Sequence, residues 1–408
     1  GTEMDLHSMT AMRLSSWCTL SLALSIFTYV FWRHSEYARN ISVYGSDMLL
    51  SVQLETFQTG GIGNNVFELM SSIGIAKTTG RTLVLPSDLY KQFSIRHHEF
   101  INLLDGVYPQ WEGTNMNGKY IDKRLSDCCR YDRGIIDDIR KSTASVTNVD
   151  LRYLQSYRYF MDLPREEIFS RLELSSHIKV VVDRDISNKN VFSHHDHILC
   201  VHSRRGDFLS TGAIQSPSNA SYLLNATDFV YKTQNVNSTL VVLIGDDLKW
   251  QNEIAITLRS QRKNALVLPR LKGLSTPVAD WQISRMYCDT VLLTASASTF
   301  GWWIGYLSKG QKVYYNPEPS THPQYNKEFD STEFFPTSWI PLYSSELLNN
   351  EESHNPESSI IFTTKKITNH KSSEQINNND LNKNEIGQTL YSPSSVLPLN
   401  SSELPEKI

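Results

Sequence analysis

The sequence has no excess of either charge. Its 408 residues include 39 lysines and arginines against 43 aspartates and glutamates, which gives a formal net charge of -4 and a pI near 6.3. Such a chain has no general positive field to attract nucleic acid or an acidic membrane surface. Internal repeats are absent, and so are the Cys-x-x-Cys and spaced Cys/His patterns of zinc sites. We therefore expect any anion-binding site to be local, and we expect no zinc site.

Cysteine is scarce, with 5 residues in the chain. Cys18 falls in an apolar segment, which leaves Cys128, Cys129, Cys200 and Cys288 as an even set that could form two bridges in an oxidising compartment. The pairing cannot be deduced from the sequence. Buried free thiols at Cys200 and Cys288, beside expected strands, are the alternative.

One stretch, from Leu14 to Trp32, has no charged residue and is bounded by Arg13 and Arg33. At about 1.5 Å per residue it would cross a hydrocarbon layer of ~30 Å. The stretch predicts an uncleaved transmembrane signal-anchor, with residues 1–13 as a cytoplasmic tail and the polar residues 33–47 as a stem. A cleaved signal peptide is the rival interpretation.

Several Asn-x-Ser/Thr triplets follow the apolar stretch. Such triplets are glycosylated only on a chain that enters a secretory lumen, so their clustering between Asn219 and Asn237 favours a lumenal catalytic part. The triplets begin at Asn40, Asn219, Asn225, Asn237 and Asn400.

Short apolar runs alternate with segments of helical length through the middle of the chain. This alternation is typical of α/β units with parallel sheets, and two clusters of runs predict two domains, residues 48–195 and 196–343. Residues 344–408 are polar and are predicted to be a disordered tail. The runs expected to form strands are Met48–Leu54, Thr82–Leu85, His197–His202, Thr239–Ile244, Ala265–Leu268, Thr290–Thr294 and Lys312–Tyr315.

The segment LCVHSRRGDF, Leu199 to Phe208, brings two arginines to the end of an apolar strand. Ligands of α/β sheets sit just outside such strand ends, and an arginine fork suits a pyrophosphate. We expect one of Arg204 and Arg205 to face the ligand and the other to pair with Asp207 or another carboxylate. Gly206 would let the turn approach closely.

Two further segments have a similar form. TGGIGNNVFELM takes the chain from a strand through Gly61 and Gly63 into an apolar helix that carries Asn64. In Asp280–Tyr306, Asp280 is expected to cap a helix, and a strand then leads to a hydroxyl cluster suited to phosphate oxygens. That cluster is Ser296, Ser298 and Thr299, and we expect core packing for at least one of Trp302 and Trp303.

Together these segments resemble the α-1,2-fucosyltransferases of glycosyltransferase family 11, which carry HxRRGD, GGxGNQxF and D-x8-D-x6-SxSxFxWW patterns. LQSYRYF, Leu154 to Phe160, is a weaker echo. Asn65 replaces the family's glutamine. The resemblance implies a GT-B arrangement, in which two Rossmann-like domains face each other across a cleft, and a type II single-pass Golgi membrane enzyme. The enzyme would transfer L-fucose from GDP-fucose to the 2-hydroxyl of galactose on a glycan acceptor, with inversion and without a metal.

The resemblance also assigns roles. Arg204 would contact the GDP-fucose phosphate and act in catalysis with Asn64, His202 would lie against the nucleoside, and Asp280 would recognise guanine. The remaining donor-binding candidates are Arg205, Gly206, Asp207, Ser296, Ser298, Thr299, Gly61 and Gly63.

Some assignments stay open. Asp246 and Asp247 could be a metal-binding pair, but a turn at a strand end is favoured. Glu68 and Asp207 are general-base candidates by position alone. Two other kinds of protein would also fit: an inactive glycan-binding or nucleotide-binding relative, and an adhesion protein that displays Arg205–Asp207, an RGD tripeptide, on a loop tip.

Overall fold

The computed structural model describes residues 48–54, 60–110, 119–121, 129–151, 153–186, 192–210, 214–234, 236, 238–271 and 277–347. The expected cytoplasmic tail, anchor and stem, residues 348–408, Cys128, and the triplets at Asn40, Asn237 and Asn400 all lie outside these ranges. Residues 344–347, predicted as the start of the disordered tail, are helical, and Leu347 is buried, so that boundary was placed too early. Among the residues that the structure describes, no helix has the length and apolar character needed to span a bilayer.

The first sheet has five strands in the order β3-β2-β1-β5-β4, and every neighbouring pair is parallel. Its central strand, β1, precedes the long buried helix α2 in the chain, and Gly61 is the N-cap of that helix. The strands are β1 Leu49–Leu54, β2 Thr82–Leu85, β3 Tyr108–Pro109, β4 Lys119–Ile121 and β5 Val146–Leu151. The helices of this part are α2 Ile62–Thr78, α3 Ser87–Arg96, α4 Arg133–Lys141, η2 Tyr157–Tyr159, α5 Arg165–Arg171 and α6 Ser176–Asp185.

The second sheet has six parallel strands in the order β11-β10-β9-β6-β7-β8. Counted along the chain, this is the 3-2-1-4-5-6 order of the dinucleotide-binding fold, with its switch point between β6 and β9. The strands are β6 His197–Ser203, β7 Thr239–Gly245, β8 Asn264–Val267, β9 Thr290–Leu293, β10 Lys312–Tyr315 and β11 Ile340–Pro341. The helices are η4 Asp207–Leu209, α7 Ala220–Thr233, α8 Leu248–Ser260, α9 Ala279–Tyr287, α10 Thr299–Leu307, α11 Pro323–Glu328 and α12 Ser331–Phe334.

The chain thus has the predicted α/β class with parallel sheets, and it passes from one sheet to the other between Leu151 and His197. Both sheets belong to one compact unit. A single hydrophobic cluster includes residues of both, such as Leu50 of β1 and Val291 of β9.

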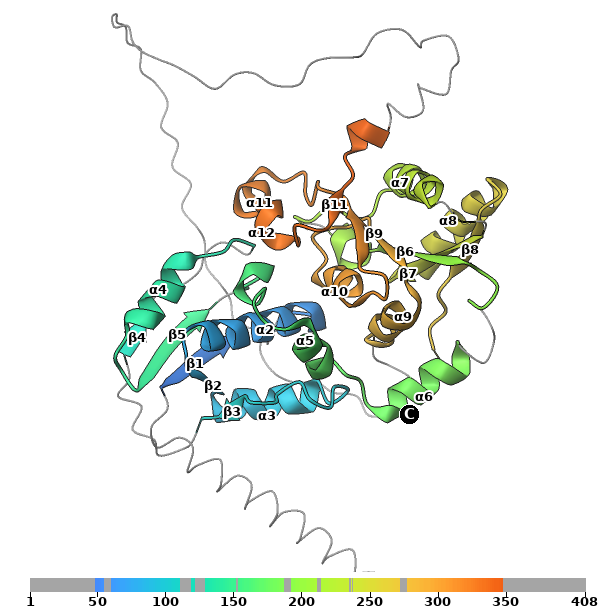
Figure 1. Ribbon diagram of the computed structural model, residues 1–408. Helices are drawn as coiled ribbons and strands as arrows, with labels where there is room; N and C mark the ends of the chain where they lie inside the picture. Colours follow the sequence, from blue (N-terminus) through green and yellow to red (C-terminus); the bar gives the residue numbers. More distant parts are fainter. Residues whose placement is uncertain are drawn as a thin grey trace, which may run out of the picture. The chain divides into compact units, whose positions relative to one another are not determined.

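Helix α10 joins the two parts by packing against α2 (Figure 1). Trp302 and Trp303 are both fully buried, so the packing role expected of at least one applies to both. Their rings lie 4.8 and 5.7 Å from that of Phe67 on α2, and the Trp303 indole donates to the Gly63 carbonyl at 3.2 Å. Edge contacts between large rings add to the energy of their burial.

Cys200 of β6 and Cys288, the residue after α9, form a disulfide with their Cα atoms 5.6 Å apart. The interpretation of these two residues as free thiols is therefore wrong. The bridge closes a sequence separation of 88 residues and ties α9 to the central strand of the second sheet.

Candidate active site

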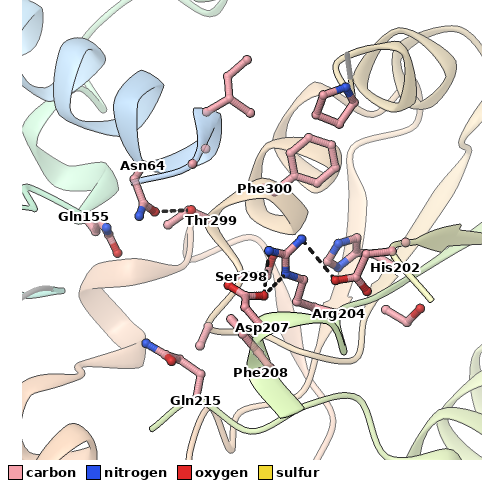
Figure 2. Close-up of a pocket in the computed structure, with 18 of the residues that line it drawn as sticks. Asn64, Gln155, His202, Arg204, Asp207, Phe208, Gln215, Ser298, Thr299 and Phe300 are labelled. Carbon is pink, nitrogen blue, oxygen red and sulfur yellow. Dashed lines mark hydrogen bonds and ion pairs between the residues drawn. The ribbon is translucent and has the colours of Figure 1, made fainter. Parts of the chain in front are cut away.

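A cavity of about 480 Å³ opens where the carboxyl ends of β6 and β7 meet the first turns of α2, α9 and α10 (Figure 2). Ligands of doubly wound sheets bind at this edge, beside the switch point. The lining residues are Gly61, Ile62, Gly63, Asn64, Tyr153, Gln155, His202, Ser203, Arg204, Asp207, Phe208, Ile214, Gln215, Gly245, Asp246, Arg270, Pro277, Asp280, Ala297, Ser298, Thr299, Phe300, Tyr325 and Glu328.

Two helix N-termini meet at the cavity. Asn64, in the first turn of α2, accepts a hydrogen bond from the Thr299 hydroxyl at the start of α10, with the oxygens 2.5 Å apart (Figure 2). Ser298 caps α10 by accepting from the Gly301 N–H at 3.2 Å. A Cβ at Gly63 would lie 2.6 Å from the Phe300 nitrogen, so the approach of the two helices requires glycine there. N-terminal N–H groups at such a junction suit an anionic ligand.

Arg204 points into the cavity and is held by two carboxylates. Its Nε and Nη2 atoms lie 2.8 and 2.7 Å from Asp207 Oδ1, and its Nη1 lies 3.3 Å from Asp246 Oδ2 (Figure 2). The side chain keeps 33% of its surface exposed, whereas that of Asp207 is 63% exposed. The guanidinium is therefore fixed in direction yet open to a ligand.

Arg205 turns away from the cavity. Its Nε lies 3.2 Å from Asp247 Oδ2, its Nη1 donates to the Ser218 carbonyl at 3.0 Å, and its guanidinium lies 4.5 Å from the centre of the Trp250 ring. As expected, one arginine faces the cavity and the other is bound to a carboxylate outside it. The carboxylate that binds Arg205 is Asp247, whereas Asp207 pairs with Arg204. Since Arg205 is fixed against the protein, it is not presented on a loop tip as an adhesion tripeptide requires.

His202, at the end of β6, is 1% exposed and lines the cavity. Burial, with a further contribution from the Arg204 charge, lowers the pKa of His202 to about 3, so the imidazole is neutral at physiological pH. Within the described part of the chain its buried Nδ1 has no hydrogen-bond partner. A neutral ring in this position can face an uncharged ligand group without electrostatic cost.

Asp280 reaches the cavity from the first turn of α9. The helix is preceded by Val278 as N-cap, so the expectation that Asp280 caps it is wrong. Burial raises the pKa of Asp280 to about 7, and the nearby Arg270 opposes this rise. The carboxyl can therefore change its charge state close to neutral pH.

Several candidates fall outside the lining. Arg205, Gly206 and Ser296, assigned to the ligand site from the sequence, do not line the cavity. Ser296 is 1% exposed and its hydroxyl lies inside the protein. Gly206 is exposed, and a Cβ there would lie 2.7 Å from Asp246 Oδ2. The other candidates, Gly61, Gly63, Asn64, His202, Arg204, Asp207, Asp280, Ser298 and Thr299, all line the cavity.

The acidic candidates are bound to protein donors. Asp247 caps α8 by accepting from the Trp250 N–H at 3.0 Å, and Asp246 accepts from the Arg205 N–H at 2.9 Å. Glu68, the other general-base candidate, is fully buried and does not line the cavity, which argues against a role as base. In the described ranges, no group of three or more potential metal ligands is assembled.

Part of the lining lies outside the sequence motifs. Arg270 follows β8 and brings a second cation toward Asp280, while Gln155 and Gln215 supply neutral amides. Tyr325 and Glu328 come from α11. Of these lining residues, Gln155 alone lies in a segment that the sequence singled out, the weak family match LQSYRYF.

The sequence model of glycosyl transferase family 11 matches residues 124–342. A Caenorhabditis elegans protein, svh-11, whose name assigns it provisionally to the galactoside 2-alpha-L-fucosyltransferases, is 30% identical over 295 residues, covering 69% of this chain and 76% of its own. Two C. elegans proteins named galactoside 2-alpha-L-fucosyltransferase are each 27% identical, over 286 and 326 residues. The first match covers 68% of this chain and 76% of the relative, and the second covers 72% and 77%.

Among solved structures, the chain is similar to NodZ α-1,6-fucosyltransferase soaked with GDP-fucose, with 16% identity, a TM-score of 0.41, and coverage of 67% of this chain and 97% of NodZ. It is also similar to POFUT1 in complex with GDP, with 14% identity, a TM-score of 0.36, and coverage of 66% and 98%. With TM-scores below 0.5, these likenesses do not bear on the site.

Proposed function

This chain belongs to glycosyl transferase family 11, and from that membership we propose that it is a galactoside 2-α-L-fucosyltransferase. It transfers L-fucose from GDP-fucose to the 2-hydroxyl of a galactose residue on a glycan and inverts the β linkage of the donor to an α linkage. The names of the relatives support the fucosyl group, the galactoside acceptor and the linkage. The observation that carries the proposal is the cavity at which Arg204, Asp280 and the α10 N-terminus converge.

GDP-fucose lies with its guanine toward Asp280 and His202 and with its diphosphate toward Arg204. Guanine presents adjacent N–H donors that an ionised carboxylate can accept together, which suits Asp280. The diphosphate suits a guanidinium fork next to the hydroxyls of Ser298 and Thr299 and the N–H groups of α10. In this arrangement the two Rossmann-like parts act as the halves of a GT-B cleft, with the donor held mainly by the second.

During transfer, the bond from fucose C1 to the diphosphate breaks while the galactose O2 forms the new bond from the opposite face and releases its proton to solvent. Negative charge then grows on the departing GDP. Arg204 stabilises this charge without having to move, because Asp207 and Asp246 already hold its guanidinium in place. Since arginine and helix N-termini supply the positive potential, the reaction needs no metal.

We further propose that the enzyme is a type II Golgi membrane protein with a lumenal catalytic part. The uncharged stretch Leu14–Trp32 and the Asn-x-Ser/Thr triplets support this, and Asn219, which begins one triplet, is exposed. The full-length chain should then resist carbonate extraction from membranes. A mature N-terminus mapped near residue 33 would instead indicate a cleaved signal peptide.

The activity is tested with the purified full-length chain, GDP-fucose and a panel of galactosides, with linkage analysis of every product. We expect release of GDP coupled to an α-1,2-fucosylated galactoside. Another linkage would contradict the assigned specificity. Binding of GDP-fucose without any transfer would favour the inactive binding relative.

A further inference from the structure

Gln155 is a buried polar residue in the cavity wall that no donor motif contains. Its side chain is 7% exposed and lines the cavity. Its Oε1 lies 3.8 Å from the Cys129 sulfur, which is disulfide-bonded and so has no hydrogen to donate. Among the described residues, none accepts a hydrogen bond from the Gln155 amide nitrogen. Since Gln155 lines the cavity, its amide is available to hydrogen-bond a ligand there.

The backbone before Gln155 is strained. Tyr153 and Leu154 have φ angles of 65° and 45°, in the left-handed region that favours glycine. Helix α2 holds them there: Glu68 accepts from the Tyr153 N–H at 2.8 Å, and the Ser71 hydroxyl donates to the Leu154 carbonyl at 2.8 Å. Strain that the surrounding structure maintains is concentrated at functional positions in proteins.

The backbone after Gln155 is fixed as well. The Ser156 hydroxyl donates to the Glu333 carbonyl of α12 at 2.7 Å and caps η2. Gln155 is thus held between α2 of the first part and α12 of the second. Such support on both sides makes its amide a rigid recognition group rather than an adaptable one.

The chemistry of Gln155 suits a neutral sugar. An amide offers both a donor and an acceptor, which match the hydroxyls of a sugar, whereas the diphosphate calls for the charged fork of Arg204. In the view of Figure 2 the Asn64–Thr299 pair lies between Gln155 and Arg204, so Gln155 is on the side of this pair away from the guanidinium proposed to face the diphosphate. Gln215 lies on the same side of the view.

We propose that Gln155 is a specificity-determining residue that hydrogen-bonds a hydroxyl of the acceptor galactoside. This assignment rests on the proposed function. The turn built on α2 then serves to hold that amide at the acceptor end of the cavity, while the donor motifs hold GDP-fucose at the other end.

The test compares the full-length parent with Gln155→Met, which keeps an unbranched shape but has no amide, and with Gln155→Glu, which loses the two N–H donors. Gln282→Leu, at a half-buried glutamine of α9 outside the lining, is the matched control. For both Gln155 variants we expect kcat/KM for the acceptor to fall about tenfold or more, mainly through KM. The KM for GDP-fucose and the melting shift given by GDP should stay within about twofold of the parent values.

A set of deoxygalactosides, lacking O3, O4 or O6 in turn, makes the test specific. On the derivative that lacks the hydroxyl bound by Gln155, the parent and Gln155→Met should become equal, while the difference persists on the others. The assignment is overturned if the parent and Gln155→Met differ in kcat/KM by the same factor on every derivative. It is also overturned if the Gln155 variants bind GDP-fucose more weakly, as a raised KM for GDP-fucose would show. If the parent transfers fucose and the Gln155 variants match it, only this assignment fails. If the parent transfers fucose to no galactoside, the proposed function fails and the assignment fails with it.

Discussion

Replacing the two adjacent arginines that follow β6, one at a time, should separate catalysis from stability. Arg204 lines the cavity and Arg205 does not, although the sequence places them side by side. Arg204→Ala removes the fork proposed to face the diphosphate, and Arg204→Lys keeps the charge without the fork. Arg205→Ala removes contacts to Asp247, Ser218 and Trp250.

The expected sizes follow from these contacts. A charge-assisted hydrogen bond contributes ~1.5–3 kcal/mol, so Arg204→Ala should lower turnover by at least about 10-fold to 100-fold, and Arg204→Lys should recover little of it. The same change should cost less than about 1 kcal/mol of stability, because exposed ion pairs contribute little and Asp207 is 63% exposed. Arg205→Ala should cost about 2 kcal/mol, since it removes one ion pair, one hydrogen bond to a buried segment and a cation–π contact.

The assay pairs steady-state turnover with thermal melting in the presence and absence of GDP. Arg204→Ala should melt near the parent temperature and lose the stabilisation that GDP gives. Arg205→Ala should melt lower by about 4 °C or more and keep that stabilisation. If Arg204→Ala binds GDP and turns over like the parent, or if the two variants exchange these phenotypes, the division of roles is wrong.

Three further results are expected. EDTA should leave turnover nearly unchanged, and a loss that manganese restores would point back to the aspartate pair after β7. Cys200→Ser should lower the free energy of unfolding by about 4 kcal/mol, because the bridge to Cys288 closes a long loop; equal denaturant midpoints for variant and parent would contradict this. The affinity for GDP should fall by up to about tenfold for each pH unit below 7. The raised pKa of Asp280 lets its carboxylate protonate in this range, and only the ionised carboxylate accepts both hydrogen bonds from guanine. Titration calorimetry of Asp280→Asn should show weak binding without this pH dependence.

Most residues of the strands that the sequence predicted are apolar and buried. Thr82–Leu85 and Lys312–Tyr315 have the predicted bounds, and β8 is displaced by one residue. The prediction missed β5, which pairs with β1 along its whole length, because its VTNVDL sequence mixes polar and apolar residues. Its buried Thr147 is satisfied by donating to the Ser142 hydroxyl at 3.0 Å, a contact that no periodicity reveals.

The missed edge strands have a different cause. β3 and β11 are two residues long, each includes a proline, and each lies at the edge of its sheet. Proline cannot donate to a strand neighbour, so it is tolerated at an edge and its presence argues against a strand in sequence reading. Hydrophobic patterns therefore did not reveal these two edge strands.

For the site, the motifs located residues but not their partners. Asp207 is three residues from Arg204 and two from Arg205, so spacing alone did not decide which arginine it binds. The pairing of Arg205 with Asp247 depends on β6 and β7 being neighbours in the sheet. Gln155 gave little signal because its position depends on a left-handed turn without glycine.

Convergence at the cavity depends on sheet order and on close packing at glycine. Because β6 lies between β7 and β9, parallel register pairs His202 with Leu293 and brings the loop after each strand to the same edge. Helix α10 starts after the loop that follows β9. It passes so close to β6 that a Cβ at Gly301 would lie 2.4 Å from the His202 ring. On its other side, α10 packs equally closely against α2, where a Cβ at Gly63 would lie 2.6 Å from the Phe300 nitrogen. The position of α10, and with it that of Ser298 and Thr299, is therefore fixed from both sides by backbone packing rather than by attraction between the charged groups of the site.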